Sequence, residues 1–170
     1  MGVKDLQPEL ALKALGLELP KPALALANYE AWAIVGDKFV SSGQFPWVDG
    51  ELKFKGVMGR DLDFAESYAA CQLAALNAIA QLKAALNGFD RLRRIYRMEG
   101  VLNVSPTFTE FPKALNGASD LLVNMFGERG KHTRMIWTNS ITPINSPCLV
   151  FIYADVASEA AQINQNAEEK

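Results

Sequence analysis

Apolar and polar residues alternate with a period of two in several stretches of the chain, which predicts β-strands. In residues 31–44 the alternation is interrupted at Val35-Gly36-Asp37-Lys38, and Gly-Asp between two strand-like runs predicts a tight β-hairpin. Residues 91–103 alternate in the same way and predict a strand with one partly polar face. Two closing strands are predicted at residues 134–140 and 148–156, separated by a loop that is rich in proline.

The longest helical signal runs from about Phe64 to Leu86, where Ala, Leu and Gln dominate. Apolar residues fall on one side of this segment at the helical period: Leu73, Leu76, Ala80 and Ala84. Asp63 is a suitable N-cap, and Gly88 is a suitable stop. A second helix is predicted over residues 111–127, because Pro is accepted in the first helical turn and Gly commonly follows the last turn.

This order of elements predicts an α+β domain, in which a mixed sheet carries two helices on one face. The last strand carries apolar side chains on both faces of the sheet, so the face opposite the helices must also be shielded from water. Association of several copies would shield it. We expect residues 28–156 to form one domain. An Ala- and Pro-rich arm over residues 1–27 precedes it on the domain surface, and a polar tail over residues 157–170 follows it.

Composition and charge exclude several classes of function. The 170 residues are 49% apolar, which suits one domain with its own core. The net charge is -2 and the basic residues are scattered, so nucleic acid is not an expected partner. Cys71 and Cys148 lie in apolar runs, which favours buried free thiols. We find no export signal and no apolar run of about 18 residues, so we expect a cytoplasmic protein without a membrane partner.

Two patches far apart in the sequence carry polar residues suited to a small ligand. The first extends from Asn28-Tyr29 to Ser42-Gly43-Gln44, and the second from Asn116-Gly117-Ala118-Ser119 to Lys131-His132-Thr133-Arg134. The planar guanidinium of Arg134 could form two parallel hydrogen bonds with a carboxylate. The alternative for Arg134 is a surface or interface salt bridge.

Other residues with reactive side chains give less specific signals. His132 is the only histidine and has no nucleophile at motif spacing, so we expect it to pack structurally or at an interface. One His and two separated Cys do not favour a metal site. The arginines within residues 91–97 point to both faces of a strand and do not converge on a phosphate. The tryptophans are expected in the core and at interfaces: Trp32, Trp47 and Trp137.

Several short motifs together resemble a longer-chain branch of the Rid family (YjgF/RidA, endoribonuclease L-PSP-like). The resemblance covers roughly residues 15–156 and is specific in the aggregate, since each motif alone is weak. The motifs are Ser42-Gly43-Gln44-x-Pro46-x-x-Asp49-Gly50, Leu82-Lys83-Ala84-Ala85-Leu86, Asn103-x-Ser105-Pro106-x-Phe108, Pro112-Lys113, Asn116-Gly117-Ala118-Ser119-Asp120-Leu121-Leu122, Phe126-Gly127 and His132-x-Arg134.

The resemblance implies a chorismate-mutase-like fold assembled as a homotrimer, with ligand clefts between subunits and no metal or organic cofactor. The best-known branch hydrolyses reactive 2-imino acids and enamines to 2-keto acids and ammonia. By position, Arg134 would hold the substrate carboxylate, Ser42, Gly43 and Tyr29 would line the cleft, and Asn116 would assist.

The chain departs from the family pattern where a Glu helps to position the attacking water. Leu149 occupies that position, Phe151 occupies the next position on the same face, and Ile136 replaces a Cys that often follows the Arg. A leucine cannot accept a proton or a hydrogen bond, and loss of a positioned acid or base typically removes a factor of about 100 to 10,000 in rate.

Glu99 is a candidate catalytic replacement for the missing Glu. Strand alternation places it in register with Ile95 and Val101, where its carboxylate could face a neighbouring subunit's cleft. The alternative is a salt bridge with Arg93 or Arg97.

The resulting hypothesis is a homotrimer that binds a small 2-keto or 2-imino acid between subunits, with enamine or imine hydrolysis as its chemistry. A second hypothesis is a non-catalytic metabolite-binding or protein-interaction trimer, which the apolar Leu149 and Phe151 favour. A third is a divergent member that serves one biosynthetic pathway and accepts an enamine without general-base help.

Overall fold

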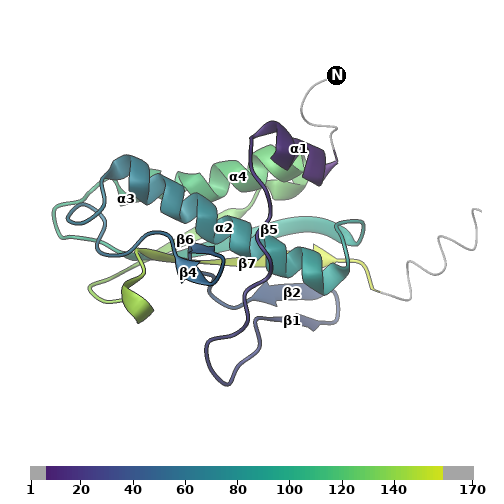
Figure 1. The fold of residues 1–170 in the computed structure, drawn as a ribbon. Helices are drawn as coiled ribbons and strands as arrows, with labels where there is room; N and C mark the ends of the chain where they lie inside the picture. Colours follow the sequence, from purple (N-terminus) through teal and green to yellow (C-terminus); the bar gives the residue numbers. More distant parts are fainter. Residues whose placement is uncertain (1–6, 159–170) are drawn as a thin grey trace, which may run out of the picture.

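A five-stranded mixed sheet forms one layer of the domain, and the helices lie on one side of it (Figure 1). The computed structural model describes residues 7–158. The strand order is β1-β2-β7-β5-β6, in which only β5 and β6 run parallel. The strands are β1 (Trp32–Val35), β2 (Lys38–Ser41), β5 (Leu92–Asn103), β6 (Thr133–Asn139) and β7 (Cys148–Val156). The predicted α+β class, the mixed sheet and the hairpin in residues 31–44 are therefore confirmed.

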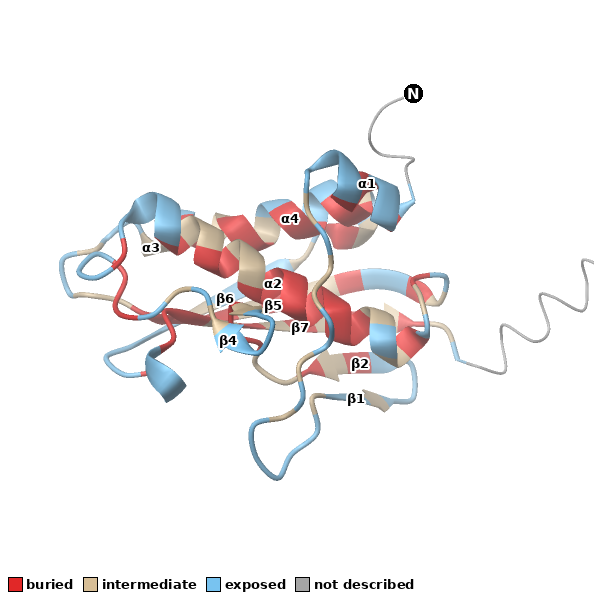
Figure 2. Cartoon of the chain, in the orientation of Figure 1, coloured by how far each residue is buried: buried red, intermediate tan, exposed pale blue. Residues whose placement is uncertain are grey.

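The central helix α2 (Phe64–Leu86) begins and ends at the expected residues. The Asp63 side chain accepts from the Glu66 N–H at 2.8 Å, and Glu66 accepts in return from the Asp63 N–H at 3.0 Å, which completes a capping box. Asn87 ends the helix in the left-handed conformation, one residue before the predicted Gly88. Burial extends around most of the helix rather than along one side (Figure 2). Ala84, which was expected on the apolar side, is exposed.

Within residues 7–158, only α2 is long and apolar enough to cross a membrane by length and composition. Its most apolar stretch of 18 residues is 67% buried inside the domain. Polar residues such as Gln72, Asn77 and Gln81 interrupt the apolar sequence of this helix, so the prediction of no continuous apolar run of about 18 residues holds. Its alanines raise the mean hydropathy of a helix that packs between the sheet and other helices.

The second predicted helix is divided at Leu115 into α3 (Phe111–Ala114) and α4 (Asn116–Phe126). α4 packs so closely on α2 that a Cβ atom at Gly117 would lie 2.1 Å from the backbone oxygen of Tyr68. The Tyr68 hydroxyl also donates to Asp120 at 2.8 Å. Glycine at this position therefore allows the close approach that holds the first turn of α4 against α2.

The predicted arm contains a short helix, α1 (Pro8–Ala14), whose Ala11 and Leu12 are buried. Leu12 belongs to the same core as α2 and α4. The remaining short elements are β3 (Trp47–Val48) paired with β4 (Glu51–Leu52), and the single turns η2 (Gly127–Gly130) and η3 (Pro143–Asn145). The proposed division into arm, domain and tail stays a prediction, and most of the tail lies outside the described residues.

The side chains of β5 do not simply alternate between the two faces of the sheet. The pairing of β5 with β7 shifts register between Leu92 and Arg94 and again between Ile95 and Arg97. Leu92, Ile95 and Met98 are consequently all buried on the helix side. The prediction that Glu99 shares a face with Ile95 is therefore wrong. A β-bulge changes which residues face the core, and the alternation of side chains cannot reveal it.

The sheet face opposite the helices is largely apolar and is not covered by any element in residues 7–158. Trp137 and Met135 on β6 are 52% and 40% exposed. The partly buried residues of this open face on β5 and β7 are Val101, Leu149, Phe151 and Tyr153. The three tryptophans lie outside the core of this chain, since Trp32 is also 36% exposed and Trp47 is half-buried, and their expected place at interfaces stays a prediction.

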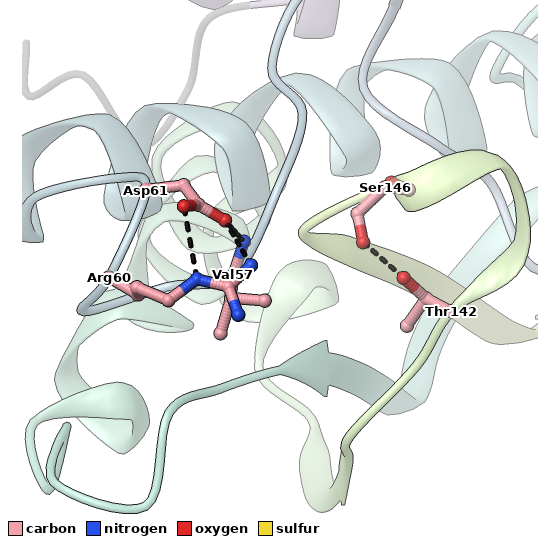
Figure 3. A network of polar contacts seen from close by, with 5 residues as sticks. All are labelled: Val57, Arg60, Asp61, Thr142 and Ser146. Carbon is pink, nitrogen blue, oxygen red and sulfur yellow. Dashed lines mark hydrogen bonds and ion pairs between the residues drawn. The ribbon is translucent and has the colours of Figure 1, made fainter.

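Polar groups fix two loops near one end of the sheet (Figure 3). Asp61 accepts from the Val57 N–H at 2.8 Å and from the Arg60 guanidinium at 2.7 Å. These contacts, the Arg60 bonds above all, lower the pKa of Asp61 to about 2. In the other loop, the Thr142 hydroxyl donates to the backbone oxygen of Ser146. Neither loop contains a predicted site residue.

Cys71 and Cys148 are both buried and free, as predicted. Burial raises the pKa of the Cys148 thiol well above its usual value, and the neighbouring Cys71 adds to the effect. The Cys148 thiol is therefore protonated and unreactive.

Candidate functional site

Arg134 lies on the edge strand β6, on the side of the sheet that faces the helices. Its partner in the register is the buried Met98, and side chains at paired positions share a face. From there the guanidinium reaches the start of α4. Nη1 donates to Asn116 Oδ1 at 2.8 Å and to Ser119 Oγ at 3.3 Å, and Nη2 donates to the Pro112 carbonyl at 3.3 Å. The structure thus brings together two predicted site residues, Arg134 and Asn116.

These three acceptors are neutral, so they orient the Arg134 guanidinium without cancelling its charge. Among residues 7–158, no carboxylate forms an ion pair with it, and the side chain is exposed. The predicted alternative of a salt bridge within the chain is therefore not observed in this part of the protein. A guanidinium has five N–H donors, so Nε–H and one Nη2–H are left for an external acceptor. The two atoms are neighbours on one edge, as bidentate carboxylate binding requires.

His132 lies beside this arginine and is half-buried. Its Nδ1 lies 2.6 Å from the Gly130 carbonyl and its Nε2 lies 3.1 Å from Ser119 Oγ. Burial holds the pKa of His132 below its usual value and the positive charge of Arg134 lowers it further, although the hydrogen bond to Gly130 acts in the opposite direction. The predicted packing role for His132 omitted these polar contacts.

Tyr29, Ser42 and Gly43 form a second group at the other edge of the sheet. The Ser42 hydroxyl donates to the Glu30 carbonyl at 2.5 Å, and the Tyr29 hydroxyl accepts from the Leu26 N–H at 3.3 Å. These bonds hold the loop that carries Tyr29 next to the end of β2. Tyr29 itself is 44% exposed, so its ring is available to a ligand or another protein surface.

Gly43 lies directly beneath two apolar side chains of β7. A Cβ atom at Gly43 would approach Phe151 Cζ to 2.6 Å and Leu149 Cδ2 to 2.9 Å. These are the two positions where the resemblance implies carboxylates. The structure therefore places the departure from the family pattern next to the Ser42-Gly43 pair, in the second group of site residues.

The two groups do not meet within one chain. Ile152 N–H donates to Ser41 Oγ at 3.0 Å, Ile152 pairs with Met98, and Met98 pairs with Arg134. Ser41 and Arg134 therefore lie at the same level of the sheet, with β7 and β5 between their strands. Three steps between neighbouring strands correspond to about 14 Å.

Three surface cavities of about 430–500 Å³ lie elsewhere, and none is lined by a predicted site residue. The cavity near the loops of Figure 3 has Arg60, Phe108 and Thr138 among its lining residues. The predicted site residues of one chain thus lie in two separate groups.

Glu99 lies on the open face of the sheet. Arg97 Nε donates to its carboxylate at 2.7 Å, and the Trp137 indole N–H donates at 3.2 Å. The Arg97 guanidinium holds the pKa of Glu99 below its usual value, against a smaller opposing effect of burial. The predicted alternative of a salt bridge with Arg97 is confirmed. Glu99 also pairs in register with Phe151 on the neighbouring strand β7. Phe151 is one of the two positions where the resemblance implies a carboxylate, so Glu99 places an ionised carboxylate one strand away from it.

Sequence reasoning missed the roles of Ser119 and of the Pro112 carbonyl. Asn116 and Ser119 are three residues apart, and residues at this spacing lie on the same face of a helix. That spacing could have identified Ser119 as a second hydrogen-bond acceptor for Arg134. No comparable signal exists for a backbone carbonyl. Residues 7–158 contain no group of three or more His, Cys, Asp or Glu able to hold a metal ion.

Known proteins resemble the chain over nearly all of this domain. A "putative endoribonuclease" from Shewanella oneidensis MR-1 is 55% identical in sequence, with a TM-score of 0.87 over 89% of this chain and 100% of that one. Protein TCP17 of Trypanosoma cruzi is 38% identical over 124 residues, which are 72% of this chain and 78% of that protein.

Escherichia coli TdcF, solved with bound serine, shares the fold at 19% identity, with a TM-score of 0.57 over 83% of this chain and 96% of that one. The family model described as "YjgF/chorismate_mutase-like, putative endoribonuclease" matches residues 9–156. The chain therefore belongs to the YjgF/chorismate mutase-like family, the Rid family that its motifs resemble.

Proposed function

We propose that this protein binds a small 2-keto or 2-imino acid in a cleft between two copies of the chain, with Arg134 holding the ligand carboxylate. The observation that carries the proposal is the oriented but unneutralised guanidinium of Arg134, which keeps Nε–H and one Nη2–H for an outside acceptor. A carboxylate presents two coplanar oxygens to such an edge. The bound serine in E. coli TdcF supports the proposal, because serine also carries a carboxylate.

The second half of the cleft would come from a neighbouring copy, through its Tyr29, Ser42 and Gly43. Two features support an intersubunit site. The half-sites of one chain lie on strands that β7 and β5 separate, and the open face exposes apolar side chains such as Trp137 and Met135. Covering this face with other copies would remove apolar surface from water. We propose the homotrimer typical of the family as the assembly.

Imine hydrolysis is the chemistry that such a cleft could promote. Water adds to the carbon of the protonated C=N bond, and the resulting carbinolamine expels ammonia to leave the 2-keto acid. Fixing the carboxylate orients the electrophilic carbon, which lowers the entropic cost of attack. Glu99 of another copy is the proposed acceptor for the water proton, because its carboxylate lies on the open face of the sheet. Its bond with Arg97 holds its pKa below the usual value, which keeps it ionised at neutral pH but makes it a weak base. The reaction needs no metal or organic cofactor, and a cytoplasmic location suits substrates released by pyridoxal-phosphate enzymes.

A non-catalytic binding protein is the second candidate. The contacts of Leu149 and Phe151 over Gly43 favour it, because they replace acid groups by an apolar surface. An apolar wall suits a ligand with a larger hydrophobic side chain and provides no proton acceptor.

Calorimetric titration of the wild type with 2-ketobutyrate and with its uncharged amide tests the proposal. We expect the acid to bind about tenfold or more tightly than the amide, since only the acid forms charge-assisted bonds with Arg134. Equal affinities, or no binding of either compound, would contradict it.

In parallel, semicarbazide trapping of 2-iminobutyrate and of a bulkier aromatic imine distinguishes the two candidates. A binder that leaves the imine lifetime unchanged is the non-catalytic one.

A further inference from the structure

The protonation of His132 follows from its surroundings. Nδ1 lies 2.6 Å from the Gly130 carbonyl, and a carbonyl can only accept, so Nδ1 carries the hydrogen. Arg134 is the only charged group acting on the ring among the described residues, and its charge, like burial, favours the neutral form. In a neutral imidazole with hydrogen on Nδ1, Nε2 is an acceptor.

This tautomer determines the direction of the next hydrogen bond. Because Nε2 at 3.1 Å accepts, the Ser119 hydroxyl must donate its hydrogen to His132. Ser119 Oγ then presents only lone pairs to its other neighbour, Nη1 of Arg134, at 3.3 Å. A directed chain of three hydrogen bonds therefore runs from Arg134 through Ser119 and His132 to the Gly130 carbonyl in η2.

We propose that His132 is a positioning residue for Arg134, which acts through Ser119 to fix which edge of the guanidinium faces the ligand. With Ser119 as an obligatory acceptor, both Nη1 hydrogens have fixed partners in Ser119 and Asn116. The edge formed by Nε and Nη2 is then the one presented outward. The inference rests on the proposed function, in which this edge binds a carboxylate.

The chain of bonds also connects three elements whose relative position matters for the cleft. Gly130 lies in η2, Ser119 in α4 and Arg134 in β6. Gly130 is tightly enclosed, since a Cβ atom there would lie 2.0 Å from the Leu122 backbone oxygen of α4. The carbonyl that anchors His132 is therefore held firmly against the same helix that carries Ser119.

Two substitutions at His132 distinguish the directed chain of hydrogen bonds, called the relay below, from a role of His132 in packing alone. His132→Asn can keep a donor for the Gly130 carbonyl but leaves Ser119 without its acceptor. His132→Gln places an amide oxygen where Nε2 stood and gives up the bond to Gly130. We expect His132→Asn to bind 2-ketobutyrate about fivefold more weakly than wild type, as for one lost hydrogen bond, and His132→Gln to recover most of that loss. Equal weakening in both variants, or no change in either, would overturn the inference.

A measurement without ligand keeps this test separate from that of the proposed function. His132 is the only histidine in the chain, so its ring ¹⁵N resonances need no assignment. At pH 7 we expect the neutral Nδ1–H tautomer, and slower guanidinium rotation of Arg134 in wild type than in His132→Asn. An Nε2–H tautomer, an imidazolium, or equal rotation in both proteins overturns the relay. If the relay is present and the wild type binds no 2-keto acid, only the proposed ligand is wrong.

Discussion

Replacing Arg134 by alanine is expected to weaken binding of 2-ketobutyrate about 100-fold and to abolish any acceleration of imine hydrolysis. The substitution removes two charge-assisted hydrogen bonds to the ligand carboxylate, each stronger than a bond between neutral groups. It leaves Asn116 and Ser119 partly exposed, so the fold should remain intact. Calorimetric titration measures the affinity, and semicarbazide trapping measures the hydrolysis.

Arg93→Ala is the matched control for the charge of Arg134. Arg93 is exposed on the same sheet and lies 4.0 Å from Asp155, a surface pair of little energetic weight. Its loss changes the net charge by the same amount and should leave affinity unchanged. An equal decrease in both variants would mean that the ligand responds to overall charge, and full binding by Arg134→Ala would remove Arg134 from the site.

Leu149→Glu is expected to raise the rate of imine hydrolysis about 100-fold or more, because a positioned acid or base typically contributes that much. Leu149 is half-buried and its side chain extends over Gly43, so a glutamate there would direct its carboxylate at the same half-site. The rate is measured as loss of trapped 2-iminobutyrate.

Leu149→Gln separates the proton acceptor from the change in size and polarity. Glutamine has nearly the same shape as glutamate and cannot take up a proton at neutral pH. We expect no comparable gain from it. If glutamine and glutamate accelerate hydrolysis equally, polarity alone controls the cleft. If neither does, the Leu149 position is not near the reacting carbon.

Local signals in the sequence were enough for most of the fold. The caps of α2, Asp63 at its start and the left-handed Asn87 before Gly88 at its end, depend on neighbouring residues only. The hairpin turn is local in the same sense. The bulges of β5 are not, because pairing with β7 produces them and residues 91–103 alone contain no sign of them. Glu99 therefore shares no face with Ile95.

The candidate site was predictable in its members but not in its arrangement. Motif positions identified Arg134 and Asn116, which the fold brings to a hydrogen bond of 2.8 Å. The distance across the sheet to Ser42 and Gly43 depends on the strand order, which no local pattern contains. The choice between core and interface for Trp137 was open for a related reason, since an apolar side chain predicts burial but does not say whether the same chain provides it.

The central claim is that each cleft combines half-sites from two copies, and mixing two inactive variants tests it most directly. Arg134→Ala lacks one half-site, and Gly43→Glu fills the other, because even a Cβ atom at Gly43 would approach Phe151 Cζ to 2.6 Å. Refolded together in equal amounts, the two should recover 2-ketobutyrate binding in about one quarter of the clefts, because random association pairs intact halves that often. Each variant alone should show no binding at the ligand concentration that saturates the wild type, because its affinity is about 100-fold weaker. A mixture that binds no more ligand than its separate components would contradict a site shared between copies.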